Sequence, residues 1–205
     1  MVGLGNPGSD YATSRHNVGF MVVDRLVERW GESPRSFQGK FGSVLMQSVH
    51  RGQRVHLQKP MEYMNLSGSA LQRAMAYFRV EPARIVVIHD EIDLPYGRVR
   101  VKVGGGHGGH NGLRSISQAI GPDYLRVRGG VGRPRGEAHA GGGGHGGKTG
   151  GKDHVSGHVL GPFSRAEQKE LPLFIDSLGD AVEAILEQGV TYAMNRFNGE
   201  PGQNS

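Results

Sequence analysis

The sequence contains no cysteine, and this absence excludes several classes of chemistry. Without a thiol, the chain has no disulfide framework, no cysteine nucleophile and no cysteine-ligated zinc site, which fits a reducing compartment. The chain also lacks an apolar run long enough to cross a bilayer, and it lacks the charged and then apolar leader of a secreted protein. We therefore expect a soluble, cytoplasmic protein that does not enter a membrane.

The charge balance is the most informative part of the composition. Lysine and arginine number 24 against 19 aspartate and glutamate residues, which gives a formal net charge of +5. A net positive charge is typical of proteins that bind phosphate groups, although a basic surface without a binding partner gives the same net charge. The length of 205 residues suits one domain with a sizeable core, so we predict a single domain over residues 1–205.

The segment VGLGNPG, residues 2–8, matches the G-x-G-x-x-G spacing of a dinucleotide-binding turn. That fingerprint requires a preceding strand, a helix that opens on the third glycine, and an acidic residue about 20 positions later. Only two residues precede Gly3, Pro7 lies where the helix should begin, and Asp24 falls in a stretch with helical apolar spacing. We therefore do not expect a nucleotide cofactor, and Asn6 in this tight turn needs another explanation.

Predicted strands and helices alternate along the rest of the chain. The patterns predict strands at about 42–49, 53–60, 84–90, 98–104 and 124–132, and helices at about 17–30, 67–78, 112–121 and 165–189. Ser164 and Glu167 form a capping-box pattern before the last helix. This order predicts an α/β fold, a three-layer sandwich with a central mixed, mostly parallel twisted sheet.

One segment differs in composition from the rest of the chain. Between Gly129 and Gly151, twelve of 23 residues are glycine. Apolar side chains there are too few to offset the ordering entropy of so much glycine. We predict a flexible surface loop at about 136–152.

Four polar loops adjoin the predicted strands: GNPGSDYATSRHN, KPMEYMNLSG, HDEIDLPYG and GGGHGGHNG. Loops at the carboxyl ends of strands in an α/β sheet gather in one crevice, so we expect these four to meet. The crevice would hold His16, Asp90 and the side-chain amides of Asn6, Asn65 and Asn111.

A histidine paired with a carboxylate, in a sequence without the sharp turn that presents a serine or cysteine nucleophile, points to a general base acting on water. Water has a pKa of about 15.7, and an imidazole with a pKa of about 6.5 can take its proton as it attacks. Asp90 on the other ring nitrogen of His16 would fix the tautomer and stabilise the imidazolium. The amides could hydrogen-bond a carbonyl oxygen or the oxyanion that forms from it.

Three other interpretations compete with this one. In a metallohydrolase, the HDEID and HGGH segments with His154 and His158 would supply ligands, but a third acid-rich element is missing and HGGH lacks helical spacing. An RNA-binding protein without turnover would have no need for both His16 and Asp90. A structural or interaction protein would explain the basic charge but not the four polar loops.

Long stretches of the chain resemble the bacterial peptidyl-tRNA hydrolase family. They are GLGNPGxxYxxxRHNxGF, KPxxYMNLSG, HDEIDLPYGRVRVKxGGGHGGHNGLRSI and VLGPFSxxE, in this order from Val2 to the final helix. Family members cut the ester between a peptide and the ribose of tRNA, recycling tRNA from peptides that left the ribosome early. The resemblance implies a monomer without metal or cofactor. Its partners would be peptidyl-tRNA and stalled large ribosomal subunits.

The resemblance also implies roles for individual residues. His16 takes the place of the general base, Asp90 that of its orienting acid, and Asn6 that of the residue that discriminates blocked from free amino termini. The implied tRNA contacts are Tyr11, Tyr63, Asn65, Asn111, Lys102 and Arg128. Arg100 and Arg133 are further candidates for phosphate contacts.

The sequence departs from the family pattern in four places. Almost no residues precede Gly3, Ser14 replaces a threonine, and the glycine-rich segment is longer than usual. Gly129 replaces a branched apolar residue, which predicts a weakened strand. None of these departures affects His16 or Asp90.

Overall fold

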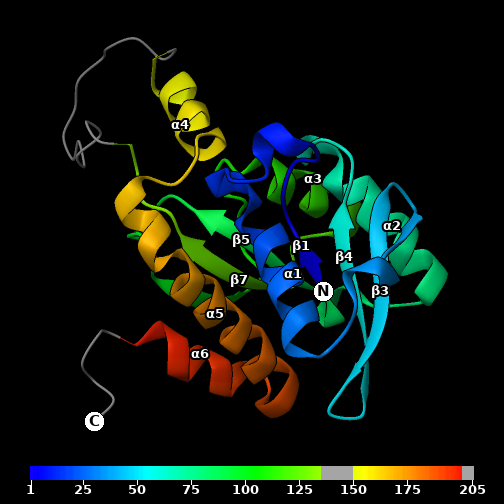
Figure 1. Ribbon diagram of the computed structural model, residues 1–205. Coiled ribbons are helices and arrows are strands. Elements are labelled where there is room, and N and C mark those ends of the chain that lie inside the picture. Colours follow the sequence, from blue (N-terminus) through cyan, green and yellow to red (C-terminus); the bar gives the residue numbers. More distant parts are fainter. Residues whose placement is uncertain (135–149, 200–205) are drawn as a thin grey trace.

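Seven strands form one sheet in the part of the chain that the structure describes, in the order β2-β3-β4-β1-β5-β7-β6. The computed structural model describes residues 1–134 and 150–199, except for the side chains of 150–153 (Figure 1). The strands are β1 (Val2–Gly3), β2 (Gln38–Lys40), β3 (Ser43–His50), β4 (Gln53–Pro60), β5 (Val86–Glu91), β6 (Val99–Val103) and β7 (Leu125–Gly130). Strands β3 and β6 run against the other five. The predicted mixed, mostly parallel sheet is thus confirmed.

Helices cover both faces of this sheet. They are α1 (Val18–Arg29), α2 (Ser67–Phe78), α3 (Asn111–Ile120), α4 (Gly150–Leu160), α5 (Arg165–Gln188) and α6 (Val190–Asn198). Helices α1 and α5 pack on one face and α2 and α3 on the other, each pair over its own apolar cluster (Figure 1). The three-layer α/β sandwich predicted from the sequence is confirmed.

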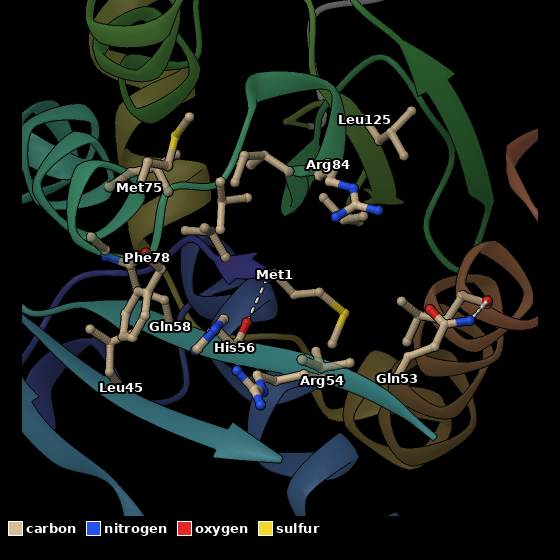
Figure 2. A pocket seen from close by; sticks show the side chains of 18 of the residues that line it. Met1, Leu45, Gln53, Arg54, His56, Gln58, Met75, Phe78, Arg84 and Leu125 are labelled. Carbon is tan, nitrogen blue, oxygen red and sulfur yellow. Dashed lines mark hydrogen bonds between the residues drawn. The ribbon is translucent and has the colours of Figure 1, made fainter. Parts of the chain in front are cut away.

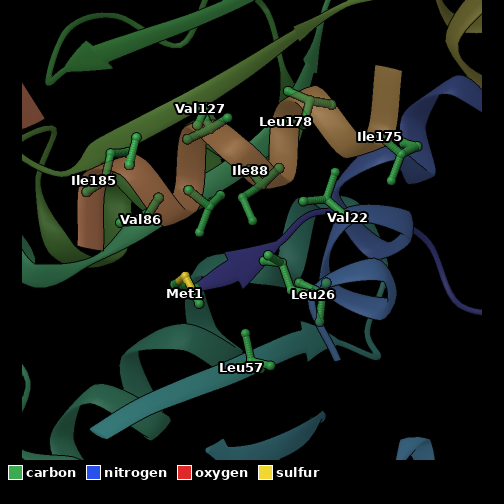
Figure 3. Packing of buried hydrophobic residues seen from close by; sticks show 14 of the residues in the cluster. Met1, Val22, Leu26, Leu57, Val86, Ile88, Val127, Ile175, Leu178 and Ile185 are labelled. Carbon is green, nitrogen blue, oxygen red and sulfur yellow. The ribbon is translucent and has the colours of Figure 1, made fainter. Parts of the chain in front are cut away.

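Both faces of the central strand β5 are buried, as its continuous apolar run predicts. Val86 and Ile88 contribute to the cluster under α1 and α5, whereas Val87 contributes to the cluster under α2 and α3. Figure 3 shows Leu178 of α5 and Leu26 of α1 in the first of these clusters. Side chains alternate between the two faces of a strand, so a strand covered on both sides must be apolar throughout. This burial fixes β5 in the interior of the sheet, between β1 and β7, with its polar residues at its carboxyl end.

The predicted capping box fixes the start of the long helix α5. The Ser164 side chain accepts a hydrogen bond from the Glu167 backbone N–H at 3.3 Å, and the Glu167 carboxylate accepts one from the Ser164 N–H at 2.6 Å. These bonds satisfy N–H groups that have no partner within the helix.

Several features differ from the predictions. Helix α4 begins at Gly150, so the predicted end of the flexible loop at residue 152 is wrong; residues 136–149 of that loop lie outside the described residues. The sequence pattern did not predict this helix, because the segment is rich in glycine and glycine disfavours helices. Strand β2 and helix α6 were not predicted either.

Gly129 lies inside β7, opposite Asp90 of β5 and Val99 of β6. A Cβ atom at this position would lie 3.0 Å from Leu178 Cδ1 and 3.1 Å from Phe174 Cζ. The glycine therefore gives α5 room to pack closely on the sheet. The predicted weakening of the strand stays a prediction.

No helix among the described residues is both long enough and apolar enough to span a membrane.

Candidate active site

A buried carboxylate at the carboxyl end of β5 binds two histidines. Asp90 is 3% exposed, and its Oδ1 lies 2.8 Å from His16 Nδ1 and 3.0 Å from His110 Nε2. His16 lies in a short 3-10 helix immediately before α1, and His110 is the N-cap of α3. We call these three residues the His–Asp–His cluster. Three of the four polar loops therefore meet here, as predicted, but the role of His110 was not foreseen.

The hydrogen bonds of His110 determine its tautomer. Its Nδ1 accepts hydrogen bonds from the backbone N–H groups of Gly112 at 3.1 Å and Leu113 at 3.3 Å, and so caps α3. A ring nitrogen that accepts a hydrogen bond carries no proton, so the proton of a neutral ring lies on Nε2 and is donated to Asp90. Protonating His110 would cost the helix both capping bonds. We infer that His110 is a neutral donor to Asp90.

His16 has the opposite arrangement. Its Nδ1–H faces Asp90, which leaves Nε2 with a free lone pair. Burial by itself would lower the pKa of His16, but the charge of Asp90 and the hydrogen bond to it outweigh burial and raise this pKa above 6.5. Burial likewise favours the neutral form of Asp90, yet the two histidines hold the pKa of Asp90 well below its ordinary value. The cluster therefore pairs an ionised carboxylate with an imidazole whose pKa, and hence basicity, the carboxylate raises.

The turn GLGNPG brings Asn6 next to the segment that carries His16, because Asn6 bonds the neighbouring Asn17. Asn6 is 7% exposed, and its backbone is held by Asn17: the Asn6 N–H donates to Asn17 Oδ1 at 2.8 Å, and Asn17 Nδ2 donates to the Asn6 carbonyl at 2.9 Å. The Asn6 Oδ1 accepts from the Met64 N–H at 2.9 Å. Because Oδ1 is occupied in this way, the side-chain amide presents Nδ2 as its donor. Sequence analysis missed Asn17, although it belongs to the motif RHN.

The four remaining predicted polar contacts border this region on its exposed side. Tyr63 is 65% exposed, Asn65 and Asn111 are exposed, and Tyr11 is half-buried. Tyr63 and Asn65 flank Met64, which is bonded to Asn6, and Asn111 follows His110, which is bonded to Asp90. Tyr11 lies in the loop that joins Asn6 to His16. Among the described residues, no hydrogen bond joins their side chains to the His–Asp–His cluster.

The predicted phosphate-binding cations differ in availability. Lys102 is exposed and has no ion pair with an acidic group of the described residues. Arg128 binds Glu91 at 2.9 Å, and Arg133 Nε binds Asp93 at 3.0 Å. Arg100 donates to the Asn198 carbonyl at 3.0 Å and so holds the end of α6. Lys102 is therefore the cation best placed to meet a phosphate without first breaking a contact.

Two buried arginines that sequence analysis missed hold the loops of the cluster. Arg15 donates to the Pro162 carbonyl at 2.7 Å and pairs with Glu167 at 2.7 Å, which ties the loop of His16 to the start of α5. Arg126 is 2% exposed and donates to the carbonyls of Gly105 and Gly106 in the loop of His110. Residue pattern alone gave no signal for either contact, because each joins segments far apart along the chain.

The only group of described residues that could hold a metal is this same cluster, whose ligand atoms lie within 4.8 Å of one another. Its ring nitrogens, however, bond directly to Asp90 or cap α3, and only His16 Nε2 remains. The acids of HDEID are also separated, since Glu91 and Asp93 pair with arginines. This donor set suits a hydrogen-bonded acid–base pair better than a metal site.

His89 of the HDEID segment lies outside this arrangement. Its Nδ1 bonds the backbone carbonyl of Asp90 at 2.7 Å. Complete burial lowers the pKa of His89 to about 3. The side chain is therefore neutral at physiological pH and is poorly suited to act as a base.

Comparisons with known proteins agree along the whole chain. The model of the family described as Peptidyl-tRNA hydrolase matches residues 1–205. The peptidyl-tRNA hydrolase of Rhodococcus opacus (strain B4) is 48% identical over 199 residues, covering 97% of this chain and 96% of the relative. That of Nocardia farcinica (strain IFM 10152) is 45% identical over 199 residues, covering 97% and 95%.

A solved structure gives the same result for the fold. The crystal structure of peptidyl-tRNA hydrolase from Acinetobacter baumannii superimposes with a TM-score of 0.83 at 39% identity, covering 96% of this chain and 92% of that chain. The likeness in fold therefore covers nearly the whole chain.

Proposed function

The chain belongs to the peptidyl-tRNA hydrolase family, and on that premise we propose that His16 is its general base. The protein is an ester hydrolase that acts on peptidyl-tRNA. The observation that carries the proposal is the 2.8 Å contact of His16 Nδ1 with Asp90, because it leaves Nε2 as the basic nitrogen. An imidazole held in this tautomer can accept a proton from water.

The hydrolysis needs one proton acceptor that later becomes a donor. A water oxygen attacks the ester carbonyl carbon while His16 Nε2 takes one of its protons, which gives a tetrahedral oxyanion. When this intermediate collapses, the bond to the ribose oxygen breaks and the His16 imidazolium returns the proton to that oxygen. The products are a free peptide carboxyl group and a tRNA with a free ribose hydroxyl. Asp90 stabilises the imidazolium between the two steps.

His110 positions Asp90 without adding charge. As a neutral donor it holds the carboxylate oxygen that also faces His16, so the carboxylate keeps its full charge for the imidazolium. A cationic neighbour would instead weaken the attraction between Asp90 and His16. We therefore assign His110 as a positioning residue.

Asn6 supplies selectivity for a blocked amino terminus. Its Nδ2 can donate to a carbonyl of the peptide, which an unblocked aminoacyl-tRNA lacks. A buried donor left without a partner costs about 1 to 3 kcal/mol, so the unblocked substrate would be disfavoured. The contact of Met64 with Oδ1 fixes the orientation of this amide.

The exposed groups around the cluster would bind tRNA. We assign this role to Tyr11, Tyr63, Asn65, Asn111, Lys102 and Arg128, with Lys102 making the phosphate contact and Arg128 exchanging Glu91 for a phosphate. We further propose a single-domain monomer that works in the cytoplasm, with stalled large ribosomal subunits as an additional partner.

One assay tests the proposal directly. The protein is incubated in parallel with N-blocked and unblocked aminoacyl-tRNA, with and without EDTA, and released tRNA is measured. We expect cleavage of the blocked substrate, sparing of the unblocked one, and no effect of EDTA. Equal cleavage of both substrates would contradict the proposed role of Asn6. Activity that is lost in EDTA and restored by a divalent ion would favour a metallohydrolase. Binding of tRNA without cleavage would indicate an inactive RNA-binding protein.

A further inference from the structure

Arg15, the residue before His16, is buried between two helix ends. Its exposed fraction is 8%, and its guanidinium donates to the carbonyls of Pro162 at 2.7 Å and His158 at 3.2 Å, at the carboxyl end of α4. The same guanidinium pairs with Glu167 in the first turn of α5 at 2.7 Å. A charged side chain is rarely buried without partners, and here the partners come from the ends of two helices.

The charges in this region alternate in sign from one helix end to the next. The carboxyl end of a helix carries a partial negative charge, which favours Arg15, and the amino end carries a partial positive charge, which favours Glu167. The Glu167 oxygen that binds Arg15 also accepts from the Ser164 N–H at the start of α5. Burial would raise the pKa of Glu167, but its bonds with Ser164 and the charge of Arg15 hold this pKa below its ordinary value. We call residues 158–167, with this ion pair, the α4–α5 junction.

The backbone of the His16 segment is bonded to the same junction. The Arg15 N–H donates to the Gly161 carbonyl at 3.1 Å, and Ser14 forms an isolated antiparallel bridge with Pro162. His16 follows directly, in the short 3-10 helix that begins at Arg15. The position of His16 therefore depends on contacts made by the residue before it.

The loop that follows Asp90 reaches the junction as well. The Tyr96 hydroxyl donates to the Glu167 carbonyl at 2.6 Å. The junction thus holds the segments of both His16 and Asp90, whose side chains lie 2.8 Å apart. A hydrogen bond weakens steeply when its geometry is disturbed, and a misplacement of about 1 Å can slow a reaction roughly a hundredfold.

A cavity elsewhere in the fold has no such connection with the pair. Its volume is about 760 Å³, and Figure 2 shows it around Met1, with Phe78 in its wall. The lining includes Val86 at the start of β5, whereas Asp90 lies near the end of that strand. No residue of the His–Asp–His cluster lines this cavity, so the α4–α5 junction is better placed to set the geometry of the pair.

We propose that Arg15 is a positioning residue for the reaction, which holds His16 at bonding distance from Asp90 by fastening the His16 segment to the α4–α5 junction. The inference rests on the proposed role of His16 as general base. Loss of the Arg15 charge by itself would favour the imidazolium and raise the pKa of His16, whereas a longer contact with Asp90 would lower it. His110, whose ring centroid lies 4.8 Å from that of His16, is a neutral neighbour in both cases.

Arg15→Lys is the main test, because lysine keeps the charge but lacks the planar fork that bonds two carbonyls and a carboxylate together. We expect kcat for a blocked aminoacyl-tRNA to fall roughly tenfold to a hundredfold, with little change in KM. The pKa of His16, followed by NMR titration of its imidazole in the free protein, should fall. The acidic limb of kcat/KM should move to lower pH with it.

Arg29→Lys is the matched control. Arg29 also binds acids of α5, Asp176 at 2.9 Å and Asp180 at 2.8 Å, but it lies at the end of α1 away from His16. We expect this variant to lose Tm to a similar degree while kcat and the pKa of His16 stay unchanged.

Glu167→Gln tests the other half of the ion pair. Glutamine can still accept from the Ser164 N–H in the capping box, so the start of α5 is kept. The substitution should lower kcat, and its effect should not add to that of Arg15→Lys, because both remove the same contact.

Two results would overturn the proposal. One is an unchanged kcat and an unchanged or raised pKa of His16 in Arg15→Lys, and the other is an unchanged kcat in Glu167→Gln, which decides the matter if Arg15→Lys does not fold. Failure of the proposed function gives a different pattern. If His16 were not the general base, Asp90→Asn would leave the rate unchanged, whereas the pKa of His16 would still fall in Arg15→Lys.

Discussion

Replacing Asp90 by Asn tests the centre of the proposed mechanism. The substitution keeps the size of the side chain but removes the charge that lies 2.8 Å from His16 Nδ1. Two unit charges about 4 Å apart attract each other by about 4 kcal/mol at an effective dielectric constant of 20, and loss of that attraction from the imidazolium state corresponds to a rate reduction of roughly a thousandfold. We expect kcat for a blocked aminoacyl-tRNA to fall by about this factor while tRNA binding survives.

The pH profile of Asp90→Asn separates loss of charge from general damage. Asp90 raises the pKa of His16, whereas burial lowers it. Without the carboxylate, the pKa of His16 should fall, so His16 stays unprotonated at lower pH and the acidic limb of kcat/KM moves to lower pH. Asp93→Asn serves as the matched control, because Asp93 is a neighbouring acid paired with Arg133 and its loss should leave the limb in place. An unchanged rate for Asp90→Asn, or an acidic limb moved to higher pH, would refute the pairing of Asp90 with His16.

Three further substitutions address the residues around this pair. His110→Asn keeps a side chain that can cap α3 but loses the bond to Asp90, so kcat should fall roughly tenfold with little change in Tm; an unchanged kcat would exclude a positioning role. Asn6→Asp keeps the Oδ1 acceptor for Met64 but removes the donor, and the ratio of kcat/KM for blocked over unblocked substrate should fall by roughly tenfold or more; a preserved ratio would contradict the assignment. Lys102→Ala should lower the slope of log Kd for tRNA against log salt by about 0.7 to 0.9, and an unaltered slope would show that this lysine meets no phosphate.

The sequence by itself predicted the features that depend on local pattern. A continuous apolar run predicted β5, amphipathic spacing predicted the long helix α5, and the capping box at Ser164 is confirmed by its two hydrogen bonds. The order of strands and helices predicted the layered α/β fold. Long motifs were sufficient to identify the family and to nominate His16 and Asp90 as partners, because catalytic groups of this kind recur in fixed sequence contexts.

Only the tertiary structure decided which groups pair and which remain available. In the sequence, nothing distinguishes His110 from the other histidines of its glycine-rich region. The structure places its ring between Asp90 and the start of α3. The sequence made Arg128 a candidate for a tRNA contact, but only the structure shows that it is paired with Glu91, a residue 37 positions away. Sequence patterns report the tendencies of neighbouring residues, whereas hydrogen bonds, ion pairs and cavities depend on segments that only the folded sheet brings together.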